Sequence, residues 1–131
     1  MLENGIKGQV EFTAEESGSA KAMGSGALDV LATPKMIAML EKAAWESVQP
    51  YLEEGCGTVG TLMNVTHDAA TPLGMKVTCT SELVQIEGKK LVFRVEAFDE
   101  KGHIGGGSHE RFIVNNEKFQ TKTNGKLQGG N

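Results

Sequence analysis

The amphipathic segment between Thr33 and Leu52 is the feature that most constrains how this chain can fold. Apolar side chains recur in it with the period of a helix that buries one face. Thr33 is a good N-cap and Pro34 suits the first helical position, so we expect the helix to begin there. Pro50 interrupts backbone hydrogen bonding, which predicts that the last turn frays or kinks.

After Gly57 the sequence changes to the alternation that is typical of β-strands. Four segments show it, with approximate limits at residues 58–67, 75–88, 91–102 and 103–115. Short turns join the last three, which forces neighbouring strands to run antiparallel, and a slip in the alternation of the second indicates a bulge. In the first segment one face is predicted to carry Val59, Thr61, Met63, Val65 and His67.

One helix and one antiparallel sheet define an α+β domain, because the apolar stripe of a single helix must be buried against the sheet. The 131 residues suit one domain spanning residues 1–131, with a polar tail after about residue 120 that we expect to be flexible. Residues 6–12 add a loosely alternating edge strand. Residues 13–28, rich in small and polar side chains, fit either a strand with a flexible crossover or a mobile loop.

Composition excludes several classes of function. A net charge of −4 and a pI near 5.4 argue against a nucleic-acid-binding protein. Cys56 and Cys79 lack the paired spacing of a zinc site, so no metal is predicted, and two reduced cysteines fit an intracellular protein. No apolar run approaches the roughly 20 residues that span a membrane, and the N-terminus lacks the pattern of a signal peptide. We therefore expect a cytoplasmic protein that binds neither nucleic acid nor membrane.

Three polar residues occupy places where apolar ones are expected. Glu41 lies at the margin of the apolar helix face, either as a boundary carboxylate or as a partly buried acid kept for chemistry. His67 ends a strand on an apolar face, as a core histidine or an active-site residue. Thr33 is either a simple cap or a hydroxyl placed where free N–H groups favour negative charge. Eight residues, or about 12 Å of helix rise, separate Thr33 from Glu41, so one site would need them at opposite ends or across a dimer interface.

Residues 30–119 show a further pattern in "LATPKMIAMLEKAAWESVQPYL", "GTVGTLMNVTHDAATPLGMKVT", "LVFRVEAFDEKGHIGGGSHERFIV" and a closing "KF". In order and in gaps these segments resemble the fluoroacetyl-CoA thioesterase-like family of hot-dog-fold acyl-CoA thioesterases. The resemblance implies a long central helix wrapped by a curved antiparallel sheet, and an edge-to-edge homodimer, or a larger assembly, with active sites at the dimer interface. It implies an acyl-CoA substrate and no cofactor, since coenzyme A is part of the substrate. It also implies catalytic roles for Thr33, Glu41 and His67, with Gly60 beside the acyl group and Arg111 lining the site.

Two regions depart from this pattern or add to it. The resemblance is weaker before Val30, where residues 20–30 carry no aromatic side chain, although the fluoroacetate-resistance member of the family has an aromatic lid there. This difference favours a more open pocket. The run Gly105–Ser108 lacks the ending of a Walker loop. We interpret it as a strand whose missing side chains let the pantetheine arm or a partner's backbone approach, or as a plain bulge.

The sequence thus predicts a thioester hydrolase that converts a short or medium acyl-CoA to free acid and coenzyme A. His67 is the natural general base, because an imidazole titrates near the working pH. The sequence does not decide whether Thr33, Glu41 or a water molecule attacks the thioester. One alternative is an acyl-CoA binding or sensing module. A hot-dog enoyl-CoA hydratase ranks lower, because such an enzyme uses an Asp and a His together and Asp68 is predicted to point to the opposite face from His67.

Overall fold

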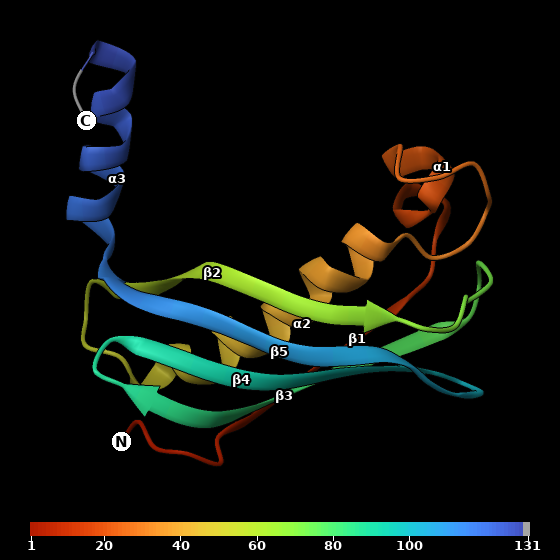
Figure 1. Cartoon of the computed structure of the whole chain (residues 1–131), viewed down its shortest axis with the longest axis horizontal. Helices are drawn as coiled ribbons and strands as arrows, with labels where there is room; N and C mark the ends of the chain where they lie inside the picture. The colour runs from red at the N-terminus through yellow and green to blue at the C-terminus, as the bar shows by residue number, and fades with distance from the viewer. Residues whose placement is uncertain (130–131) are drawn as a thin grey trace.

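The computed structural model of the protein describes residues 1–129. Five strands and one long helix make up most of it (Figure 1). In chain order the elements are β1 (Lys7–Thr13), η1 (Glu16–Gly18), α1 (Ala20–Met23), α2 (Thr33–Val48), η2 (Gln49–Tyr51), β2 (Cys56–His67), β3 (Lys76–Glu87), β4 (Lys90–Asp99), β5 (Gly102–Asn115), α3 (Asn116–Asn124) and η3 (Gly125–Gln128).

The strands form one antiparallel sheet in the order β1-β3-β4-β5-β2. Tight turns join β3, β4 and β5, as short connections between antiparallel neighbours require. The strands that flank α2 in the sequence, β1 and β2, lie at opposite edges of the sheet. The chain therefore crosses the sheet through α2, which lies along one face of the sheet, behind the strands in Figure 1. This arrangement confirms the predicted α+β architecture.

The core lies between α2 and the inner faces of β3 and β4. Alternate residues of both strands are buried, as the sequence pattern predicts, and they meet the apolar stripe of the helix. The residues of this core include Met36, Leu40, Ala44, Val48, Val77, Cys79, Leu83, Leu91, Phe93, Val95 and Ala97. Burial raises the pKa of the Cys79 thiol to about 12, so this cysteine is a core side chain and not a nucleophile.

Some predicted boundaries are confirmed and others are not. The helix ends at Val48, before Pro50, and continues only as the short η2 turn. The predicted bulge of β3 is present between Leu83 and Gln85. Residues 13–28 contain η1 and α1 in place of a strand, and α1 is capped by Ser19. No helix of the described chain is long and apolar enough to cross a bilayer.

The C-terminal tail forms helical structure beyond residue 120. Asn115 caps α3, which projects from the body of the domain (Figure 1) and is followed by η3 up to Gln128. The end of the tail, residues 130–131, lies outside the described residues. Flexibility of the tail therefore stays a prediction.

A bulge in β2 changes which residues of that strand face the helix. Its register against β5 shifts between Gly60 and Leu62, so Thr61 is an extra residue in the ladder. Because one extra residue reverses the alternation, Gly60 lies on the same face as His67. The prediction that Val59 and Thr61 share that face is wrong, since side-chain alternation assumes an uninterrupted strand.

Candidate functional site

Thr33 and His67, the first residue of α2 and the last of β2, lie in direct contact. Thr33 Oγ1 lies 2.7 Å from His67 Nδ1. The helix cap is Ala32, so the expectation that Thr33 caps the helix is wrong. Its hydroxyl is directed toward the imidazole, which lies 34 positions away in sequence. At this distance a hydroxyl and an imidazole can exchange a proton, which is the pairing of an activated nucleophile and its base.

A small pocket opens beside this pair. It has a volume of about 210 Å³, and the other residues that line it are Ala20, Ser25, Val30, Leu31, Asp68, Ala69 and Ala70. His67 Nε2 is buried and finds no hydrogen-bond partner within the described residues. Buried polar atoms normally have a partner, so this atom is available to a bound molecule.

Asp68 also lines this pocket, although alternation places it on the opposite face from His67. The strand ends at His67, and alternation does not apply beyond the last strand residue. The Asp68 carboxylate accepts a hydrogen bond of 2.9 Å from the hydroxyl of Thr66.

Glu41 belongs to a second cluster on the same inner face. Its Oε2 lies 3.1 Å from Nη1 of Arg111, and its side chain is 40% exposed against 8% for the arginine. A Cβ atom on Gly60 would lie only 2.6 Å from Glu41 Oε2. Glycine at this position therefore leaves the space that the carboxylate occupies.

The structure brings Glu41, Gly60 and Arg111 together, and Thr33 with His67, but it keeps the two groups apart within one chain. About two turns of α2, or roughly 12 Å of helix rise, separate Thr33 from Glu41. The predicted set of catalytic residues is thus divided between two places along α2. A single site that uses all of them would either extend between these two places or combine them from two copies of the chain.

Arg111 is held by more than Glu41. Its Nε donates to Thr58 Oγ1 at 2.8 Å, and its Nη2 donates to the Thr58 carbonyl oxygen at 3.1 Å. Its Nη1 also lies 3.2 Å from Nε2 of the buried His109. Burial lowers the pKa of Arg111 and the Glu41 carboxylate raises it; an arginine remains charged in proteins.

The sequence interpretation did not select Thr58 and His109. The alternation of "SHER" was a usable signal for one of them, because it places His109 on the same face of its strand as Arg111. No pattern in the sequence pairs Thr58 with Arg111, because the two residues lie 53 positions apart and meet only when β2 pairs with β5.

The glycine run of β5 has a structural explanation. A Cβ atom on Gly105 would clash with the carbonyl oxygen of Thr66, and one on Gly107 would clash with that of Asn64. These glycines therefore allow β2, the adjacent strand of the same chain, to approach β5 closely. A register shift in the β4–β5 pairing, between Ala97 and Phe98, lies beside the run and shows that a bulge is present as well.

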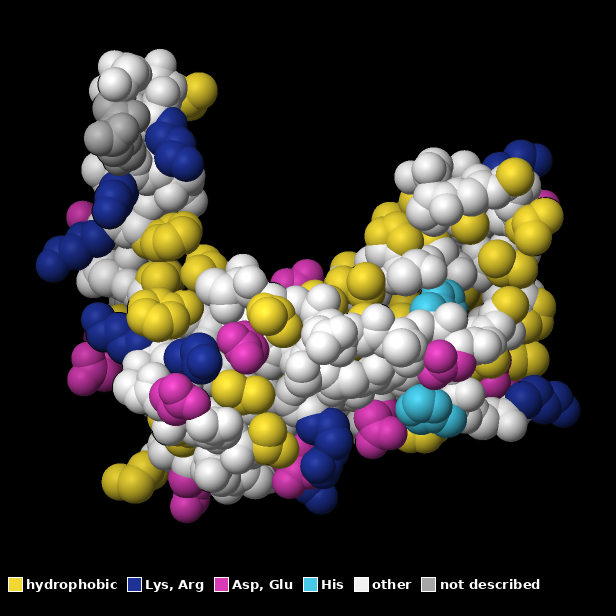
Figure 2. All heavy atoms as spheres, viewed as in Figure 1, with side chains coloured by type: hydrophobic (Ala, Val, Ile, Leu, Met, Phe, Trp, Pro, Cys, Tyr) yellow, Lys and Arg dark blue, Asp and Glu magenta, His cyan; other side chains and the backbone are white. Residues whose placement is uncertain are grey.

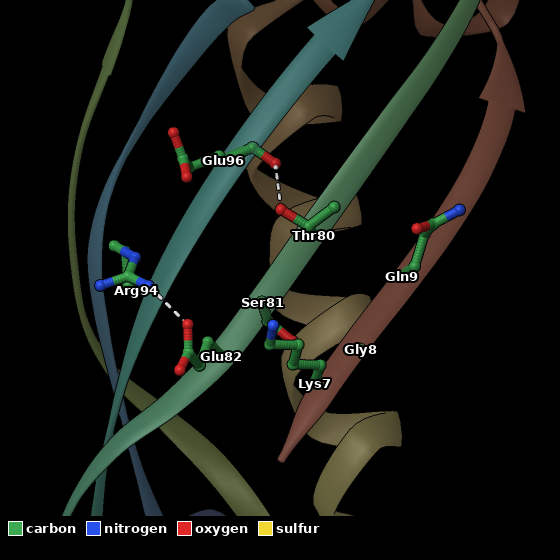
Figure 3. A pocket seen from close by; sticks show the side chains of 8 residues that line it. All are labelled: Lys7, Gly8, Gln9, Thr80, Ser81, Glu82, Arg94 and Glu96. Carbon is green, nitrogen blue, oxygen red and sulfur yellow. Dashed lines mark hydrogen bonds and ion pairs between the residues drawn. The ribbon is translucent and has the colours of Figure 1, made fainter. Parts of the chain in front are cut away.

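A second hollow on the surface is not a catalytic candidate. It has a volume of about 440 Å³ and lies on the outer face of the sheet, over β1, β3 and β4 (Figure 3). Two of its charged side chains, Arg94 and Glu82, form an ion pair, and no histidine lines it. The candidate site residues lie instead on the inner face of the sheet, where α2 lies.

A long helix packed against a five-stranded antiparallel sheet is an architecture that this chain shares with thioesterases of the hot-dog fold. The sequence model of the family described as fluoroacetyl-CoA-specific thioesterase matches residues 14–117. A fluoroacetyl-CoA thioesterase from Streptantibioticus cattleyicolor is 45% identical over 102 residues, which cover 78% of this chain and 73% of that protein. The chain belongs to this family, and the predicted class of thioester hydrolase is confirmed.

Solved structures agree with this assignment. The fluoroacetyl-CoA thioesterase FlK superposes with a TM-score of 0.90 at 36% identity, over 96% of this chain and 98% of that one. A FlK variant in complex with acetyl-CoA gives a TM-score of 0.90 at 35% identity, over 95% and 98% of the two chains. A hypothetical protein of Thermus thermophilus, described as a thioesterase superfamily member, gives 0.89 at 27% identity, over 98% and 95%. The predicted hot-dog fold is confirmed.

Proposed function

We propose that the protein hydrolyses a short acyl-CoA thioester to the free acid and coenzyme A. The observation that carries this proposal is the contact of 2.7 Å between the Thr33 hydroxyl and His67 Nδ1, in a family whose members act on fluoroacetyl-CoA. The adjoining pocket of about 210 Å³ is smaller than the roughly 300–1,000 Å³ of pockets for drug-sized ligands. A pocket of this size favours a short acyl group over a long one.

The chemistry follows from the residue types. The thioester carbonyl lies beside Thr33, and the oxygen of either Thr33 or a water molecule attacks its carbon while His67 takes the proton. The carbon–sulfur bond then breaks, and His67 returns the proton to the departing thiolate. Free N–H groups at the start of α2 favour the negative charge that develops on the carbonyl oxygen. If Thr33 attacks, water hydrolyses the acyl-threonine in a second step that uses the same base.

Glu41 joins this site through a second copy of the chain. Within the described residues β2 is an edge strand of the sheet, and Figure 2 shows a broad hollow above the place that Figure 1 gives to β2, between the places of α1 and α3. A two-fold axis at this edge pairs two β2 strands antiparallel. In the register that pairs Asn64 with the partner's Asn64, Gly60 lies opposite the partner's His67, because Thr61 is an extra residue in the ladder. Glu41, which contacts Gly60, then lies close to the partner's His67. The exposed fraction of 40% at Glu41 fits a carboxylate that faces a partner.

A panel of acyl-CoA substrates of increasing chain length, with thiol release as the readout, tests the proposal. Thr33→Ala, Glu41→Gln and His67→Ala are each expected to lower kcat at least about tenfold, since a general base alone contributes roughly 10²–10⁴-fold. His103→Ala, which removes an exposed histidine, is the matched control and should keep full activity. Undiminished rates in all three site variants would refute the site.

The position of Asp68 favours a second candidate, hydration of an enoyl-CoA. An acid and a histidine line the same pocket, which is the pair that such a reaction uses. Including an enoyl-CoA in the panel separates the two functions. Loss of the conjugated double bond without thiol release would indicate hydration, whereas thiol release indicates hydrolysis.

A further inference from the structure

We propose that His109 is a positioning residue, which fixes the guanidinium of Arg111 and through it the carboxylate of Glu41. The inference deepens the proposed function, on which the catalytic role of Glu41 rests. The contact between His109 and Arg111 is a separate claim and has its own measurement.

The hydrogen bonds of His109 define one tautomer. Its ring is buried, with only 1% of the residue exposed. Nδ1 lies 2.8 Å from the carbonyl oxygen of Leu62, and Nε2 lies 3.2 Å from Nη1 of Arg111. A carbonyl oxygen only accepts and a guanidinium only donates. Nδ1 therefore carries the proton and donates to Leu62, while Nε2 accepts from Arg111.

The surroundings keep this ring neutral and in place. Burial lowers the pKa of His109, and the Arg111 guanidinium lowers it further, against the Leu62 carbonyl, Glu41 and Glu110, which raise it. The ring stacks on Phe93, with centroids 5.9 Å apart and planes 29° apart. A neutral, stacked imidazole presents its Nε2 lone pair to the arginine in one fixed direction.

Arg111 needs the His109 acceptor because the other partner of Nη1, the Glu41 carboxylate, is partly exposed. Nε and Nη2 are anchored on Thr58, at 2.8 and 3.1 Å. Nη1 is shared between His109 Nε2 and Glu41 Oε2, and the Glu41 side chain is 40% exposed. A partly exposed ion pair fixes geometry poorly by itself. The buried histidine therefore holds the side of the guanidinium that meets the carboxylate.

The kinetic test uses three variants of one strand. His109→Phe keeps the ring and its stacking but removes both polar nitrogens, whereas His109→Gln keeps an oxygen acceptor for Arg111. The control, His103→Phe, changes an exposed histidine of the same strand. His109→Phe is expected to lower kcat by roughly 10- to 100-fold with KM nearly unchanged, as for a misplaced catalytic group. His109→Gln should recover most of that loss, and His103→Phe should show none.

A double variant and a spectroscopic readout separate positioning from general damage. On a Glu41→Gln background, His109→Phe should lower kcat no further, because the effects of substituting residues that act as a unit are not additive. Side-chain NMR should show slow rotation of the Arg111 Nη groups in the unmodified protein and in His109→Gln, and faster rotation in His109→Phe.

Each result either supports the positioning role or overturns it. Unchanged Arg111 rotation in a folded His109→Phe protein, or a full additional loss of kcat on the Glu41→Gln background, overturns it. Ring nitrogen shifts in the unmodified protein that show any state of His109 other than the neutral Nδ1–H tautomer also overturn it, even if no variant folds. Full activity of the single variant Glu41→Gln refutes the proposed role of Glu41 in the reaction, while the Arg111 rotation still decides the contact between His109 and Arg111.

Discussion

Replacing Gly60 by alanine would displace the Glu41 carboxylate more than any other neighbouring group. An alanine Cβ would lie 2.6 Å from Glu41 Oε2, and ordinary contacts begin at 3.4 Å, so the oxygen must retreat by 0.8 Å. The same Cβ would lie 3.3 Å from Arg111 Nη1, which limits the retreat toward the arginine. The Glu41–Arg111 contact of 3.1 Å is therefore disturbed.

This displacement has a calculable consequence for the rate. Misplacing a catalytic group by about 1 Å costs up to roughly 10²-fold, so Gly60→Ala is expected to lower kcat by about tenfold or more. Each factor of ten corresponds to about 1.4 kcal/mol in the activation free energy. The fold should survive, because a partly exposed ion pair contributes only about 0–1 kcal/mol to the free energy of unfolding.

The assay measures kcat and KM by thiol release, together with the free energy of unfolding. Gly125→Ala is the matched control, because a Cβ at that position meets nothing within 4 Å. Full activity in Gly60→Ala would refute the assignment of Glu41 to the reaction. A loss of activity that merely follows unfolding would refute the claim that the substitution acts on the carboxylate.

Three further predictions concern the nucleophile, the dimer and the buried thiol. Thr33→Ser should stay active while Thr33→Ala does not, and mass spectrometry after a rapid quench should find an acyl group on Thr33 only if the hydroxyl attacks. Asn64→Cys should form an intermolecular disulfide under oxidation because the residue lies at the proposed two-fold axis, whereas Gln9→Cys on the opposite edge strand should not. Because the pKa of Cys79 rises from 9.0 to about 12 on folding, the buried thiol contributes stability that is complete below pH 9.0 and is lost as pH rises toward about 12. The free energy of unfolding of Cys79→Ala, measured at several pH values, should not show the part of the decrease between pH 9.0 and about 12 that comes from this thiol.

Local periodicity was enough to predict the framework of the fold. The helical period of the segment after Thr33 predicts α2, and the alternation around Val77 and Phe93 predicts the buried faces of β3 and β4. It was enough because the side-chain directions of a regular helix or strand depend on the residue's own position and nothing else. The position of Glu41 at the margin of the helix face, partly exposed in the structure, followed from the same geometry.

Long-range contacts decided the rest. The bulge at Thr61 depends on pairing with β5, and it moves Gly60 onto the inner face that alternation assigned to its neighbours. The hydroxyl of Thr33 is directed to His67 and not to its own helix, because the end of β2 lies beside the start of α2. Sequence reasoning and the family resemblance named the residues of the candidate site, but only the folded chain shows them in two groups.

By itself the sequence determined the elements, their buried faces and the residue types available for chemistry, since these follow from spacing along the chain. The tertiary structure alone decided which of those residues touch. It placed Arg111 between Glu41 and the buried His109, and it kept Thr33 with His67 about two helical turns away. The reason is physical: a hydrogen bond requires two atoms to lie about 3 Å apart, and that distance is set by how strands far apart in sequence are paired.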